Sequence, residues 1–173
     1  MLSNHCKLLT GLGLLLAVLL AVGSATALAA TPEQAQVYKK AVAALDAADK
    51  KLTANDVAGA KTLLKEANSL FAKLQKDMPE KMKDLKLTPP QEAQWLQNNK
   101  LGEDSSAQGD KLERSGLAKL QQGEALDAQG QKDMATKLQQ EAKRELDLAT
   151  KAHLKAEIYH LRNLQLAYSF LGQ

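Results

Sequence analysis

Glycines recur every seven residues in the second half of this chain, and alanines then continue the same interval. The glycines are Gly102, Gly109, Gly116, Gly123 and Gly130, and the alanines are Ala135, Ala142, Ala149 and Ala156. Seven residues make about two turns of an α-helix, so each series lies along one helix face. Glycine destabilises a helix interior by about 1 kcal/mol relative to alanine. We therefore expect the glycine stripe and the alanine stripe to pack closely as two antiparallel helices.

The rest of the chain also reads as helix. Alanine, leucine, lysine, glutamine and acidic residues dominate it, and no stretch after residue 30 alternates apolar and polar residues as a half-buried strand does. Thr31 and Thr88 each precede proline and have glutamine three residues later, which is typical of a capped helix start. Asn55 or Asp56 is expected to cap another helix. We predict an all-α fold of two antiparallel helical hairpins with Ala/Gly-rich seams, forming either a helical bundle or a short helical-repeat array.

The first 29 residues have the features of a signal peptide. Lys7 precedes an apolar run over residues 8–22, and Ala27 and Ala29 place small residues before a cleavage site at Ala30. The alternative is a retained anchor, because the apolar run with its flanks is nearly long enough to span a bilayer. We predict cleavage and export to the periplasm or the extracellular space.

The proline-rich break near residue 80 divides the mature chain. We expect a first helical hairpin over residues 30–77, a Pro-containing linker with a short helix over 78–101, and a second hairpin with a long C-terminal helix over 102–173. Pro79, Pro89 and Pro90 interrupt the helical pattern within the first part of this linker.

Composition excludes several classes of function. The only cysteine, Cys6, lies in the signal segment, so the mature chain has no disulfide or thiolate nucleophile. Without Lys7, 22 of the 23 basic residues remain beside 20 acidic ones, interleaved along the helices, which argues against a nucleic-acid partner. We expect a non-enzymatic protein without a cofactor, in contact with other proteins, and with no membrane contact after signal cleavage.

Each hairpin resembles a tetratricopeptide-type helix pair. That family places small residues where its two helices cross most closely. The corresponding positions are Ala48, Ala60 and Ala67 in the first hairpin, and Gly123, Ala135 and Ala142 in the second. The resemblance implies two tightly packed helical pairs.

A second resemblance is shorter. Residues 87–91 read Leu-Thr-Pro-Pro-Gln, which is similar to the LTxxQ motif of the Spy and CpxP-type periplasmic chaperones. This resemblance implies an ATP-independent chaperone, and we expect such a chaperone to present an apolar surface that includes Trp95, Met78 and Met82. A helix cap explains the same threonine, proline and glutamine, so the motif leaves both interpretations open.

The C-terminal helix carries the one candidate metal motif. His153, Glu157 and His160 share a helical face, and the last two form an ExxH element like those of di-iron helical bundles. The two histidines are about 10 Å apart along the helix axis, so another helix or chain would have to complete a site. We expect no bound metal, and these three residues are the candidate ligands if one binds.

Overall fold

The structure, a computed structural model, describes residues 30–80 and 85–172, and the predicted signal peptide lies outside the described residues. These residues form four α-helices and a short 3-10 helix: α1 (Pro32–Thr53), α2 (Val57–Asp77), α4 (Pro89–Ala128), α5 (Lys132–Ala167) and η1 (Ser169–Gly172). The all-α prediction is confirmed, because every regular element in the described part of the chain is helical.

The helix starts follow the capping signals in the sequence. At the start of α1, the Gln34 backbone N–H donates to Thr31 Oγ1 at 3.2 Å, and the Thr31 N–H donates to Gln34 Oε1 at 2.9 Å. Asp56 caps α2 by accepting the Gly59 N–H at 2.9 Å. Each contact satisfies a backbone donor that a helix start leaves without an intrahelical partner.

The linker is shorter than predicted, because α4 is one helix of 40 residues that begins at Pro89. The expectation of a short helix that ends before a second hairpin at residue 102 is therefore wrong. Gly102 does not interrupt α4, because it lies against α5, where a Cβ would be 3.7 Å from the Ala156 carbonyl oxygen. Tertiary packing on α5 offsets the low helix propensity of the glycine.

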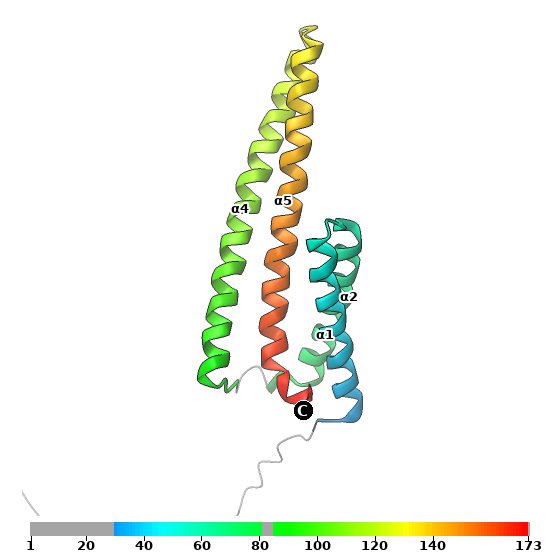
Figure 1. Cartoon of the computed structure of the whole chain (residues 1–173), viewed down its shortest axis with the longest axis vertical. Coiled ribbons are helices and arrows are strands. Elements are labelled where there is room, and N and C mark those ends of the chain that lie inside the picture. Colours follow the sequence, from blue (N-terminus) through cyan, green and yellow to red (C-terminus); the bar gives the residue numbers. More distant parts are fainter. Residues whose placement is uncertain (1–29, 81–84, 173) are drawn as a thin grey trace, which may run out of the picture.

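Helix α5 lies between α4 on one side and the α1–α2 hairpin on the other (Figure 1). The hydrophobic core joins α1 and α2 to the C-terminal half of α5 and to η1, and its fully buried large side chains include Leu45, Phe71, Leu161 and Tyr168. Two apolar stripes on α5 explain this arrangement: one stripe faces α4 along the whole helix, and a second, facing the core, begins only at Leu154.

The α4–α5 contact is a seam of glycine against alanine. A Cβ placed on Gly116 would lie 3.1 Å from the Ala142 carbonyl oxygen, and one on Gly123 would lie 3.3 Å from that of Ala135. Each step of seven residues along α4 is thus matched by a step of seven back along α5. Gly109, Gly116, Gly123, Ala135, Ala142 and Ala149 are all buried in this seam.

Gly130 does not belong to the seam, so its prediction as a helix-packing residue is wrong. It lies in the turn between α4 and α5 with a φ of +78°, and a Cβ there would meet nothing within 4 Å. Its N–H donates to the Asp127 carbonyl at 2.9 Å. The fifth glycine therefore serves the left-handed turn that ends a helix rather than close packing.

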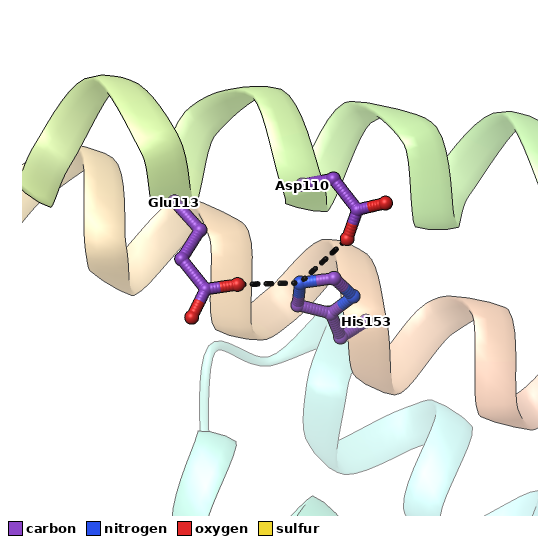
Figure 2. Close-up of side chains that lie close together, drawn as sticks. All are labelled: Asp110, Glu113 and His153. Atoms are coloured by element: carbon purple, nitrogen blue, oxygen red, sulfur yellow. Dashed lines mark ion pairs between the residues drawn. The ribbon is translucent and has the colours of Figure 1, made fainter.

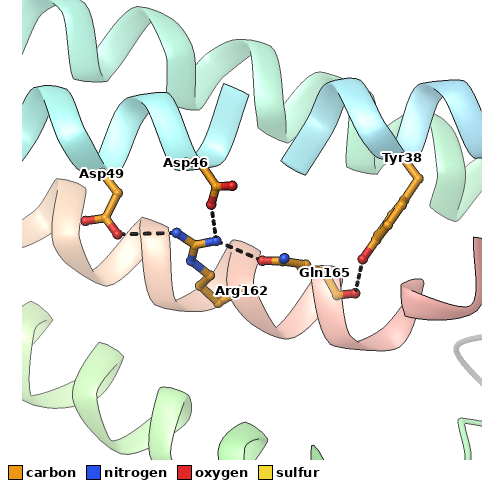
Figure 3. Close-up of polar contacts among 5 residues, drawn as sticks. All are labelled: Tyr38, Asp46, Asp49, Arg162 and Gln165. Atoms are coloured by element: carbon orange, nitrogen blue, oxygen red, sulfur yellow. Dashed lines mark hydrogen bonds and ion pairs between the residues drawn. The ribbon is translucent and has the colours of Figure 1, made fainter. Parts of the chain in front are cut away.

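Arg162 joins the two hairpins (Figure 3). Its Nη1 donates to Asp46 Oδ1 at 2.6 Å and its Nη2 donates to Asp49 Oδ2 at 3.3 Å, so one guanidinium on α5 binds two carboxylates on α1. Nearby, the Tyr38 hydroxyl donates to the Gln165 carbonyl at 3.2 Å. These contacts fix the position of α1 along α5 at the polar margin of the core.

The seam predicts opposite effects of one methyl group at two glycines. Gly102→Ala should stabilise the protein by up to about 1 kcal/mol, because its Cβ would be at least 3.6 Å from any neighbour and the helix would gain propensity. Gly116→Ala should destabilise it by about 1 kcal/mol, because its Cβ would be 2.9 Å from Leu146 Cγ. Thermal melts of the two variants measure the difference, and equal stabilisation by both would contradict the close seam.

The ion pairs of Arg162 with Asp46 and Asp49 predict that Arg162→Met destabilises the protein by about 1 kcal/mol. The two α1 carboxylates lose their partner, while methionine keeps the apolar part of the arginine side chain. Lys73→Met is the matched control, since it removes the exposed ion pair with Glu33 within the first hairpin and should change little. Urea unfolding of both variants measures the two effects. If Lys73→Met loses as much stability as Arg162→Met, the Arg162 ion pairs contribute no more than a surface ion pair.

Candidate functional sites on the long hairpin

The long hairpin of α4 and α5 projects beyond the short hairpin of α1 and α2 (Figure 1). A groove of about 370 Å³ marks the level where the short hairpin ends, lined by Leu52 and Thr53 of α1, Leu112 of α4, and Leu148 and Lys151 of α5. Residues 113–147 extend past this groove, and we call them the arm. With a rise of 1.5 Å per residue, each helix of the arm is roughly 24 Å long.

The arm has no broad hydrophobic core of its own, since its seam is filled by Gly116, Gly123, Ala135 and Ala142. Two of its larger apolar side chains are exposed: Leu117 is 53% exposed and Met134 is 52% exposed. Leu117 follows a seam glycine and Met134 precedes a seam alanine, so the two lie on opposite faces of the antiparallel pair. The arm thus exposes apolar groups on two faces.

One ion-pair cluster bridges the two helices of the arm. Lys119 Nζ on α4 donates to Glu145 Oε1 at 2.9 Å and to Glu141 Oε2 at 3.0 Å, both on α5. The hydrogen bond from Lys119, and after it one from Ser115, lowers the pKa of the Glu145 carboxyl. The hydrogen bond to Glu145, and after it the one to Glu141, raises the pKa of Lys119. The cluster favours one register of α4 against α5.

At the base of the arm, one histidine and two carboxylates converge from opposite helices (Figure 2). His153 Nε2 on α5 lies 3.6 Å from Glu113 Oε2 and 3.8 Å from Asp110 Oδ1, both on α4. One ligand-type atom from each residue lies within 4.8 Å of the other two. Imidazole nitrogen with carboxylate oxygens is a donor set that Zn²⁺ accepts.

Gly109 makes room for the imidazole. A Cβ on Gly109 would lie 2.6 Å from His153 Cε1 and 2.8 Å from Nδ1, so the ring occupies the space that any larger residue would fill. At Gly102, Gly116 and Gly123 the same construction meets an alanine carbonyl oxygen instead. The seam glycine at this level therefore sets the position of the ring relative to the two carboxylates.

Of the three residues predicted as metal ligands, the structure places only His153 in a cluster of ligand-type side chains. The structure brings His153 together with Asp110 and Glu113, and within the described residues it forms no cluster with Glu157 and His160. His160 is exposed and borders a shallow pocket with Asn98 and Gly102. The register of the seam could have predicted this cluster. Pairing Gly109 with Ala149 places residues 110 and 113 near residue 153, which lies one turn further along α5.

One of the residues predicted for a chaperone surface is buried. Met78 is 5% exposed and lies in the core, so it does not belong to an open apolar face, whereas Trp95 is partly buried against that core. Met82 lies outside the described residues. The motif at residues 87–91 has a structural use, since Gln91 Oε1 accepts the Thr88 N–H at 2.9 Å at the start of α4.

Sequence reasoning also missed a buried amide network at the foot of the seam. Asn98 Nδ2 donates to Asn163 Oδ1 at 2.9 Å, and Asn163 Nδ2 donates to Asn99 Oδ1 at 2.6 Å. Asn163 follows Ala156 by seven residues, so it occupies the next seam position on α5. Extending the alanine stripe by one step would have identified it as a buried polar residue.

No protein-family model, no curated protein and no solved structure matches this chain. Across residues 30–80 and 85–172, no helix combines the length and apolar character needed to cross a membrane.

The arm's ion-pair cluster predicts a pH-dependent contribution to stability. Because the Glu145 pKa is lowered in the folded state, the Lys119 contact stabilises the fold above the ordinary glutamate pKa and loses that effect as acid protonates the carboxyl in the folded protein. Thermal melts of the parent and Lys119→Met between pH 7 and pH 3 should differ at neutral pH and converge in acid. Lys137→Met, at an exposed arm lysine, is the control. A difference that persists unchanged at pH 3 would contradict the assignment.

Proposed function

We propose that this protein is an exported, non-enzymatic helical scaffold that binds protein partners through the arm, residues 113–147. The observation that carries the proposal is the projection of a two-helix arm beyond the hydrophobic core, with Leu117 and Met134 largely exposed on it. An extension of this kind adds surface without adding a core. Exposed apolar side chains on a rigid helical pair are suited to contact with another protein.

Charge supports a protein partner over a nucleic acid. The arm carries six basic and seven acidic residues, so neither sign prevails along it. Nucleic-acid binding requires clustered lysines and arginines that neutralise phosphates. Mixed charge around isolated apolar groups is instead typical of the polar rim and apolar centre of protein interfaces. Export rests on the signal-like residues 1–29.

Photo-crosslinking in the native cells tests the proposal. Benzoylphenylalanine at Leu117 or Met134 should capture a defined protein partner, whereas the same probe at Lys40, an exposed residue of α1, should not. Because Leu117 and Met134 lie on opposite faces, their relative yields report which face the partner covers. Equal capture at all three positions, or none, would overturn the assignment of binding to the arm.

A shortened arm gives a matched second test. Removing residues 117–123 and 135–141 together deletes one heptad from each helix and keeps the register of the remaining glycine–alanine pairs. The variant should keep its helical circular dichroism and cooperative melt, because the core lies outside the deletion. It should lose the captured partner. Turnover or a tightly bound cofactor in protein purified from its native source would overturn the non-enzymatic part of the proposal.

A Spy-type chaperone is the alternative, supported by the sequence motif at residues 87–91. Burial of Met78 weakens it, because that residue was expected on the client-binding face. A chaperone should slow aggregation of an unrelated unfolded protein at near-stoichiometric amounts and without ATP. A scaffold should leave that aggregation unchanged while still capturing its own partner.

A further inference from the structure

The histidine–carboxylate cluster at the base of the arm is a constellation that the scaffold proposal does not use. It combines one imidazole and two carboxylates from two helices, and its three side chains are reachable from solvent. We propose that His153, Asp110 and Glu113 bind a zinc ion that joins α4 to α5. This proposal stands on the local geometry and does not depend on the identity of the arm's partner.

The distances suit a zinc ion after a small contraction. Nε2 of His153 is 3.6 Å from Glu113 Oε2 and 3.8 Å from Asp110 Oδ1, and no two of the three atoms are more than 4.8 Å apart. A point equidistant from atoms so placed lies at most about 2.4 Å from each, whereas zinc bonds to nitrogen and oxygen measure about 2.0–2.2 Å. A shift of a few tenths of an ångström in half-exposed side chains closes that difference.

The surroundings position the imidazole rather than leaving it free. The ring lies against the backbone of Gly109, in the space that a Cβ at that residue would need. It therefore points Nε2 towards the turn of α4 that carries both carboxylates (Figure 2). Three protein ligands with solvent access leave a fourth coordination position for water, as in open zinc sites.

Donor chemistry selects the class of metal. Imidazole favours zinc and its neighbours among the transition metals, whereas calcium and magnesium prefer sites built from oxygen alone. Because the ligands come from two helices, the ion would act as a crosslink at the level where the arm leaves the core. Binding to the folded state alone should also raise the melting temperature.

Calorimetric titration with Zn²⁺ tests the proposal on the tag-free chain from Ala30, which contains every described helix and lacks His5 and Cys6. After removal of metal by chelation, the parent should bind one ion with a dissociation constant of about 10 µM or tighter in the presence of excess Mg²⁺. Zn²⁺ should also raise its melting temperature. Binding weaker than about 10 µM would overturn the proposal.

Matched variants separate this site from the motif expected from sequence. His153→Ala should weaken Zn²⁺ binding at least tenfold, and so should the double variant Asp110→Asn with Glu113→Gln, whose exposed positions do not threaten the fold. His160→Ala should bind as the parent does. Unchanged affinity in the double variant, or an equal loss in His160→Ala, would overturn the assignment to these three residues.

Discussion

The architecture depends on the close approach of α4 and α5. Glycines on one helix meet alanine carbonyls on the other, at distances where even one extra methyl group would be crowded at Gly116. Small residues allow many backbone atoms to come into van der Waals contact, and these contacts replace the large side chains of an ordinary bundle core. The pair therefore remains a defined hairpin past the end of α1 and α2, where no third helix of the described residues covers it.

The two halves of α5 have different roles because they carry different numbers of apolar stripes. The half from Lys132 to Lys151 has only the seam, so it forms a two-helix arm with α4. From Leu154 onward a second stripe faces α1 and α2 and builds the shared core. Arg162 then fixes the short hairpin against α5 through Asp46 and Asp49. A compact, well-packed body and a thin projecting arm thus follow from one helix.

Two polar side chains interrupt the glycine–alanine pattern of the seam. Along most of the seam, alanine lies opposite glycine, but at its foot Asn163 takes the next seam position and bonds to Asn98. At Gly109, the imidazole of His153 fills the free space and turns towards Asp110 and Glu113. Both features use the same close approach. The seam therefore supports the arm and also determines which polar side chains meet across it.

The sequence by itself determined the helical class, the seam and several helix starts, because these depend on local spacing: a period of seven residues, a threonine before proline, or a capping Asp56. It did not determine that α4 continues through Gly102 or that His153 faces α4. Those outcomes depend on which helices pair, in which register, and on which face. Only the tertiary structure decides them, because contacts between helices are set by packing over the whole molecule and not by spacing within one helix.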